Sequence, residues 1–90
     1  MNLHDAVFTD HAREQLAARA IDEAACRAVL ANPQAVHPVR RGRVVAQAVL
    51  PFTGRSGQYM LRVFVDVNRK PPEVVTAYRT SKIDKYRSRP

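Results

Sequence analysis

Two different hydrophobic periods divide this chain into a helical first part and a strand-forming second part. Between His11 and Pro33 the apolar residues recur at spacings of three and four, as in amphipathic helices. From Ala35 onward the spacing shifts towards two, which is typical of strands with one covered face. The pattern therefore predicts helices first and a sheet after them.

Two helices are predicted in the first part, after a short strand or extended arm at residues 7–9. One runs from about residue 11 to residue 19, behind a cap at Thr9 or Asp10, and buries Ala12 and Leu16. A tight link follows at residues 20–21. The other helix is capped by Asp22 and ends before the proline at position 33. Its inward stripe consists of Ala25, Cys26, Val29 and Leu30.

Strands are predicted at residues 35–39, 43–50, 59–67 and 73–79, with turns between them. In the clearest of them, residues 59–67, Leu61, Val63 and Val65 share one face, and Arg62 and Phe64 lie on the other. A final short helix, capped by Thr80 or Ser81, carries Ile83 and Tyr86 on one side.

These elements predict an α+β fold: two N-terminal helices packed on a three- to four-stranded antiparallel sheet, with a short C-terminal helix. Ninety residues are enough for one domain, so residues 1–90 are expected to share a single core. An antiparallel meander would place Arg62, Thr76 and Tyr78 on one sheet face.

Charge is unevenly distributed along the chain. Residues 1–36 hold three Arg against five Asp and Glu, a net charge of −2, whereas residues 37–90 hold twelve Lys and Arg against three acids, a net charge of +9. A basic sheet and tail favour a polyanionic partner, of which RNA or DNA is the first candidate. An acidic protein partner fits the same charge, and a surface that is basic only for solubility is the third interpretation.

The cysteine count and the hydropathy pattern bear on the cellular location of the protein. The single cysteine, Cys26, excludes an intramolecular disulfide and is expected to be a small core residue rather than a reactive thiol. No apolar run approaches the ~20 residues that span a bilayer, and no signal-peptide pattern opens the chain. We therefore expect a cytoplasmic protein with no membrane partner.

The common catalytic and metal-binding patterns are missing. The histidines at 4, 11 and 37 have no metal-ligand spacing, the acids of the sheet half are scattered, and no phosphate-binding glycine loop is present. We expect neither a metal nor another cofactor. What remains is RNA cleavage in which the substrate's own 2′-hydroxyl attacks, so that the protein supplies only a base, an acid and cations.

Four residues are the candidates for that chemistry. His11, at the N-terminus of a predicted helix, is the candidate base; the alternative is that it serves only to start that helix. Arg62 would stabilise phosphate charge, Tyr78 would orient or donate a proton, and Thr76 would anchor the substrate. The candidate nucleic-acid-binding residues are Arg13, Arg19, Arg40, Arg41, Arg43, Arg55, Arg79, Lys82 and Lys85.

Four segments form a recognisable combination: His11-Ala12-Arg13 with Arg19 eight residues after the histidine, the second helix ending in Asn32-Pro33, the strand with Arg62-Val63, and the run from Thr76 to Ile83. Together they resemble one family of small prokaryotic proteins, a domain of unknown function. The resemblance covers about residues 8–87. Members of that family usually have glycine where this chain has Ala20, so a left-handed turn at that position is expected to be strained or differently shaped.

The family is similar to the RelE/ParE-like and BrnT-like toxins of toxin–antitoxin modules. The resemblance implies a RelE-like fold, metal-independent cleavage of RNA, in some cases on the ribosome, and a cognate acidic antitoxin as partner. The alternative is a non-catalytic nucleic-acid- or protein-binding module with the same fold, because kinship of fold does not fix function. The sequence leaves open whether the protein is an enzyme.

Overall fold

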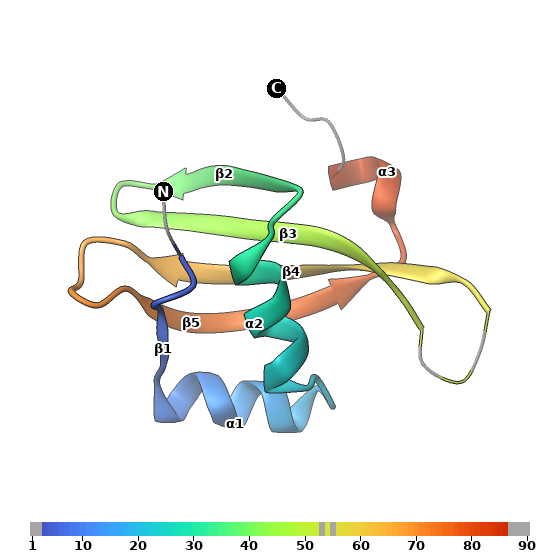
Figure 1. Cartoon of the computed structure of the whole chain (residues 1–90), viewed down its shortest axis with the longest axis horizontal. Coiled ribbons are helices and arrows are strands. Elements are labelled where there is room, and N and C mark those ends of the chain that lie inside the picture. The colour runs from blue at the N-terminus through green and yellow to red at the C-terminus, as the bar shows by residue number, and fades with distance from the viewer. Residues whose placement is uncertain (1–2, 53, 55, 87–90) are drawn as a thin grey trace.

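The computed structural model describes residues 3–52, 54 and 56–86, which form three helices and five strands (Figure 1). The α+β class predicted from the sequence is confirmed. In chain order the elements are β1 (Val7–Phe8), α1 (Asp10–Ala18), α2 (Glu23–Ala31), β2 (Ala35–Arg40), β3 (Arg43–Pro51), β4 (Gln58–Asp66), β5 (Glu73–Thr80) and α3 (Ile83–Tyr86).

The sheet is larger than predicted and it is mixed. Its strand order is β1-β5-β4-β3-β2, and the last four strands form the expected antiparallel meander. The first strand, β1, pairs parallel with β5, Val7 opposite Glu73 and Phe8 opposite Val74. The prediction of a three- to four-stranded, wholly antiparallel sheet was therefore wrong. A short strand or extended arm was predicted at residues 7–9, but its parallel pairing with a segment 66 positions away leaves no local period in the sequence.

Both longer helices begin with the side-chain caps that their sequences predict. The Thr9 hydroxyl accepts a hydrogen bond from the backbone N–H of Ala12 at 3.0 Å, and the Asp22 carboxylate accepts one from Ala24 at 3.0 Å. Figure 1 shows α2 in front of the sheet and α1 running alongside β5. These helices thus place their apolar stripes against the sheet.

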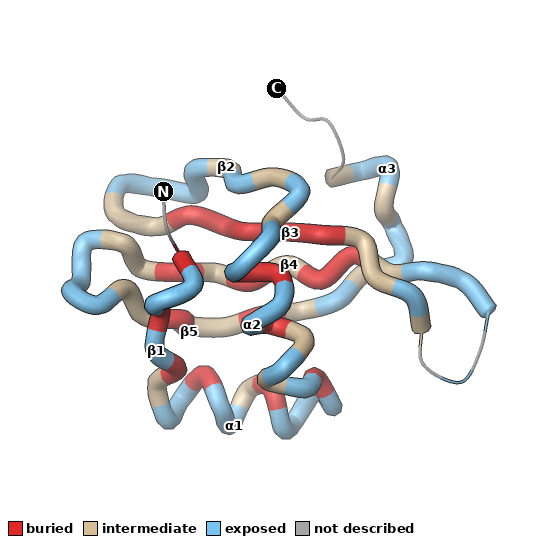
Figure 2. Tube along the Cα trace, viewed as in Figure 1, coloured by how far each residue is buried: buried red, intermediate tan, exposed pale blue. Residues whose placement is uncertain are grey.

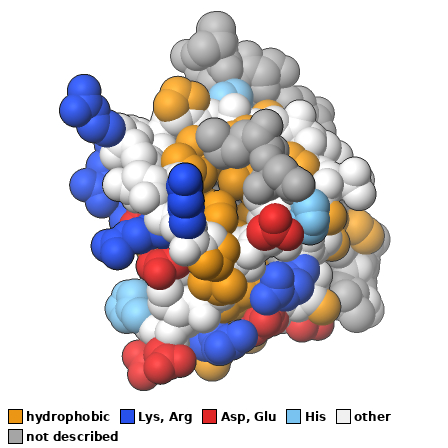
Figure 3. Space-filling model, turned by 60° about the vertical axis from the view of Figure 1, so that its left-hand side comes forward, with side chains coloured by type: hydrophobic (Ala, Val, Ile, Leu, Met, Phe, Trp, Pro, Cys, Tyr) orange, Lys and Arg blue, Asp and Glu red, His pale blue; other side chains and the backbone are white. Residues whose placement is uncertain are grey.

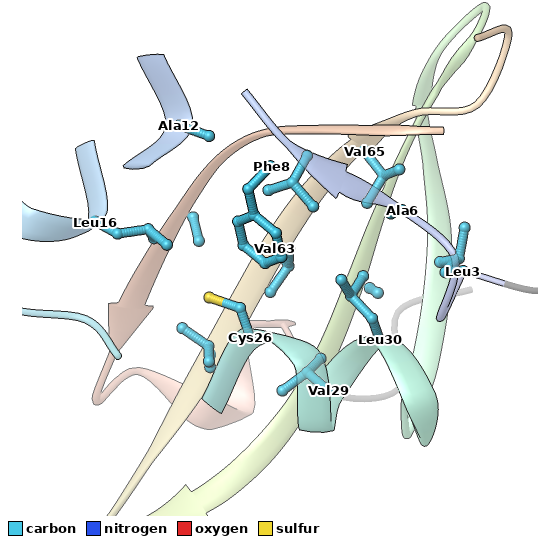
Figure 4. Close-up of a cluster of buried hydrophobic side chains, with 14 of the residues drawn as sticks. Leu3, Ala6, Phe8, Ala12, Leu16, Cys26, Val29, Leu30, Val63 and Val65 are labelled. Atoms are coloured by element: carbon cyan, nitrogen blue, oxygen red, sulfur yellow. The ribbon is translucent and has the colours of Figure 1, made fainter. Parts of the chain in front are cut away.

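One hydrophobic cluster joins the helices to one face of the sheet (Figure 4). Cys26, Val29 and Leu30 of α2 meet Val63 and Val65 of β4, and all five are buried. Figure 2 shows that the buried positions concentrate along β3 and β4, at the centre of the sheet. Cys26 is a core residue as predicted, and burial raises its pKa to about 12, so it is held as the uncharged thiol.

The link between α1 and α2 is a left-handed turn at Ala20, which has φ +54°. The backbone N–H of Ile21 donates to the Leu16 carbonyl at 2.9 Å, and the N–H of Ala20 donates to that of Ala17 at 3.2 Å. These two bonds form a Schellman motif, the turn in which glycine is most favourable. Ala20 thus adopts the left-handed conformation that is strained for alanine.

Candidate functional site

The face of the sheet opposite α2 carries the polar side chains of the central strands, and we call it the outer face. It is defined on β4 by Met60, Arg62, Phe64 and Asp66, which alternate with the core residues. In the strand register Tyr78 lies opposite Arg62, and Thr76 lies opposite Phe64. Since directly paired residues share a face, the predicted placement of Arg62, Thr76 and Tyr78 on one face is confirmed.

Arg62 is the centre of a group of side chains on this face. Its Nη1 donates to the Tyr78 hydroxyl at 2.6 Å, and its Nε donates to Gln47 Oε1 at 2.9 Å. The Phe64 ring stacks beside that of Tyr78, with 5.8 Å between centroids. The guanidinium is thus fixed in position, which is how an arginine is prepared to bind a planar anion.

The C-terminal helix completes this group. Gln47, which is 1% exposed, donates from Nε2 to the carbonyl oxygen of Tyr86 at 2.8 Å. The Tyr86 ring lies over the guanidinium of Arg62, 4.1 Å from its central carbon. Gln47, Arg62, Phe64, Tyr78 and Tyr86 are called the Arg62 cluster below. Stacking covers the face of the guanidinium, and the N–H groups that do not bond Gln47 or Tyr78 are left for an in-plane acceptor.

Two tyrosines of the Arg62 cluster have pKa values displaced in opposite directions. Burial raises the pKa of Tyr78, and its hydrogen bond to Tyr86 adds to this, while Arg62 opposes it. The hydrogen bond from Tyr78 lowers the pKa of Tyr86, and the positive charges of Lys85 and Arg62 lower it further. Of the two hydroxyls, that of Tyr86 therefore ionises at the lower pH.

A groove of about 470 Å³ opens beside the Arg62 cluster, and we call it the outer groove. Its lining comes from β2, β3, β4 and α3, and consists of His37, Pro38, Val39, Val45, Arg62, Phe64 and Tyr86. The His37 Nε2 atom is buried without a hydrogen-bond partner. The groove thus combines apolar and aromatic walls with one cation and one unpaired ring nitrogen.

Basic residues gather where the β2–β3 turn meets the β4–β5 connection. Arg43 forms a bidentate pair with Asp66, at 2.6 Å and 3.2 Å. The hydrogen bond from Arg43 lowers the pKa of Asp66, and the positive charges of Arg40 and Arg69 lower it further. Arg41, in the turn itself, is exposed. Figure 3 looks onto this end of the molecule and shows several Lys and Arg side chains there.

Two other candidate catalytic residues, His11 and Thr76, are not members of the Arg62 cluster. His11 is exposed on α1, and no described contact links it to the Arg62 cluster. Thr76 lies on the outer face, but its hydroxyl accepts a hydrogen bond from Arg19 Nη1 at 2.8 Å. The same nitrogen donates to the Ala77 carbonyl at 2.9 Å, so Arg19 closes part of the free edge of β5.

The remaining candidate binding residues are spread over the surface. Arg13 pairs with Glu23 at 3.1 Å on the helical side. Arg79 donates to the Ala20 carbonyl at 3.0 Å and borders a second cavity, of about 440 Å³. Lys82 and Lys85 are exposed beside and within α3, and Arg55 lies outside the described residues. Of these residues, Lys85 is the one beside the Arg62 cluster, with its ammonium 5.3 Å from the Tyr86 ring.

Three polar residues of the site, and the aromatic Phe64, were not predicted as site residues from the sequence. Gln47 had a visible signal, because it is the one polar residue within the apolar run from Val44 to Leu50. Tyr86 was placed on a helix without a role. His37 had no signal, because its position beside β3 and β4 depends on the pairing of an edge strand.

Neither a potential metal site nor a membrane-spanning helix is found among the described residues. In the part of the chain that the structure describes, no three His, Cys, Asp or Glu residues lie together as a potential metal site. No described helix is long and apolar enough to cross a membrane.

Fold and site together define a small basic α+β protein with an arginine–tyrosine cluster on the sheet face away from its two longer helices. Residues 8–79 match the family described as a domain of unknown function (DUF4258), and the chain belongs to that family. The predicted membership of a domain-of-unknown-function family is thus confirmed. Comparison with curated proteins and with solved structures gave no match.

Proposed function

We propose that this protein is a toxin-like endoribonuclease that cleaves RNA at the outer face without a metal. The observation that carries the proposal is the 2.6 Å hydrogen bond from Arg62 to Tyr78, beneath the ring of Tyr86. This arrangement joins the fixed guanidinium of Arg62 to two tyrosines, Tyr78 and Tyr86, whose hydroxyls can transfer protons. These are the groups that cleavage by the substrate's own 2′-hydroxyl requires.

In the proposed reaction the ionised Tyr86 removes the proton of the 2′-hydroxyl. The 2′-oxygen then forms a bond to phosphorus, and the bond from phosphorus to the 5′-oxygen breaks. The free N–H edge of Arg62 stabilises the extra charge on the phosphate. The leaving 5′-oxygen takes a proton from Tyr78, and proton transfer between the tyrosines restores both groups. The products are a 2′,3′-cyclic phosphate and a 5′-hydroxyl.

This proposal assigns the base to Tyr86 instead of His11, because Tyr86 contacts Arg62 directly. The fold is proposed to be RelE-like, on the resemblance of its motifs. The net charge of +9 in residues 37–90 supports an acidic antitoxin as the partner that holds the protein inactive. The setting would then be a cytoplasmic toxin–antitoxin module.

The test is the rate of cleavage of single-stranded RNA as a function of pH, in the presence of EDTA. A base is active when it is deprotonated, so the rate is expected to rise with pH and to level off below pH 10.0, the ordinary pKa of tyrosine, because the pKa of Tyr86 is lowered. Tyr86→Phe should abolish most of the activity and the rise with it. A rate that is lost in EDTA contradicts the proposal.

Two controls separate this reaction from a contaminating nuclease. A substrate with a single 2′-deoxy nucleotide at the cut should resist cleavage there, since it lacks the attacking oxygen. Glu14→Gln, an exposed change on α1, should have the wild-type pH profile. Activity that Tyr86→Phe leaves unchanged would belong to a contaminant or to another site.

A second candidate function is a binding module that holds RNA without cutting it. The cluster of Arg40, Arg41 and Arg69 favours it, because phosphate contacts need only exposed cations. Arg43 contributes less to this cluster, since Asp66 offsets its charge.

RNA affinity is therefore expected to fall steeply with salt, whichever candidate is right. Each phosphate contact on single-stranded RNA contributes about 0.7 to the slope of log affinity against log salt. The double variant Arg40→Gln/Arg41→Gln should flatten that slope by about 1.4, whereas Arg27→Gln on α2 should leave it unchanged. Fluorescence anisotropy with a labelled oligonucleotide measures both. An affinity independent of salt would contradict binding through the basic residues.

A further inference from the structure

The outer groove has the features of a pocket for an aromatic ring. Phe64 and Tyr86 present rings to it, and Pro38, Val39 and Val45 provide the apolar remainder of its wall. Its volume of about 470 Å³ is typical of pockets that enclose small molecules. Val45 is 1% exposed, so the floor of the groove belongs to the rigid centre of the sheet.

The groove also has one unpaired polar group. A buried ring nitrogen without a hydrogen-bond partner is unfavourable, and His37 Nε2 is such an atom. His37 is one of the residues that line the groove. An occupant with a polar atom on its edge would then supply the missing bond. Depending on its tautomer, Nε2 can donate to that atom or accept from it.

The third feature is the position of Arg62, which borders both the groove and the Arg62 cluster. Its N–H edge is suited to a phosphate, so any occupant that is joined to a phosphate can fill the groove and reach the cation together. A flat ring, a polar edge and an adjacent phosphate are the three parts of a nucleotide. Unpaired bases of single-stranded RNA offer all three, whereas bases in a duplex are stacked and covered.

We propose that the outer groove is a base-binding subsite, which holds one unstacked nucleobase of single-stranded RNA beside the phosphate at Arg62. The rings of Phe64 and Tyr86 provide the stacking surface, and His37 provides the polar contact. This inference rests on the proposed function, since it names the part of the RNA that the same site would recognise.

The test compares two ligands of equal charge, a ten-nucleotide single-stranded RNA and an abasic ribose-phosphate chain of the same length. Stacking of a base on an aromatic side chain strengthens binding on the order of tenfold. Wild-type protein is therefore expected to bind the RNA about tenfold more tightly than the abasic chain. His37→Ala and Phe64→Leu should each reduce that ratio to near one, with little change in affinity for the abasic chain.

Intrinsic fluorescence gives an independent readout, because the chain has three tyrosines and no tryptophan. Binding of RNA should quench tyrosine emission through stacking on Tyr86, and Tyr86→Phe should lose most of that quenching. Arg27→Ala, on the opposite side of the sheet, is the matched control and should keep the wild-type ratio. Thermal melting of each variant shows that it is folded; if His37→Ala does not fold, Phe64→Leu decides the test.

The outcomes separate this inference from the proposed function. Equal affinity for the RNA and the abasic chain would overturn the base-binding subsite while leaving an RNA-binding face intact. A tenfold preference that survives both His37→Ala and Phe64→Leu would also overturn it, because the base would be held elsewhere. If neither ligand binds at any salt concentration, the proposed function fails as well.

Discussion

Arg62→Ala is expected to lower the rate of RNA cleavage on the order of 10²–10³-fold, the usual effect of removing one donor that stabilises transition-state charge. Arg62 is held on the outer face by Gln47, Tyr78 and the ring of Tyr86. Single-turnover rates with excess protein measure the loss in the chemical step, apart from any loss of RNA affinity.

Arg62→Lys separates charge from geometry in the same assay. Lysine keeps the positive charge but cannot bond Gln47 and Tyr78 while presenting a planar edge to phosphate. We therefore expect it to recover only a small part of the lost rate. Arg27→Ala removes one exposed arginine from α2 and should be as active as wild type. A folded Arg62→Ala protein that cleaves RNA at the wild-type rate would remove the Arg62 cluster from the mechanism.

The shared face of Arg62 and Tyr78 was predictable because it depends on a local rule. Residues alternate along a strand, and two long strands joined by a short connection pair antiparallel. The run from Tyr59 to Val67 shows that alternation clearly, so the sides of Arg62 and of its apolar neighbours could be assigned. Alternation alone does not give the register between β4 and β5. The structure shows that this register pairs Arg62 with Tyr78.

The other members of the site depend on contacts that no local pattern encodes. His37 reaches the outer groove because β2 lies at the sheet edge beside β3, and Tyr86 does so because Gln47 and Arg62 hold the end of α3. The parallel pairing of β1 with β5 is equally distant in sequence. The sequence predicts His11 as the base because a histidine at a helix N-terminus is a plausible base. Its position relative to Arg62 depends on how α1 packs, which no local pattern encodes.

Ala20→Gly is expected to raise the free energy of unfolding by about 1 kcal/mol. Ala20 has φ +54°, a conformation in which the alanine Cβ crowds the backbone and glycine has no such cost. The gain is reduced because glycine is freer in the unfolded chain. The Schellman bonds of Ala20 and Ile21, and the bond from Arg79 to the Ala20 carbonyl, involve backbone atoms at this position and remain possible.

Ala18→Gly is the matched control, because it makes the same change two residues earlier, at the last residue of α1. There glycine gains nothing from its freedom at positive φ and should lower the free energy of unfolding by up to about 1 kcal/mol. The two variants should therefore differ by about 2 kcal/mol in urea unfolding with equal m-values, and their Tm values should move in opposite directions. A lower urea midpoint for Ala20→Gly than for wild type would show that the left-handed turn is not strained, and that the alanine side chain contributes packing that glycine loses.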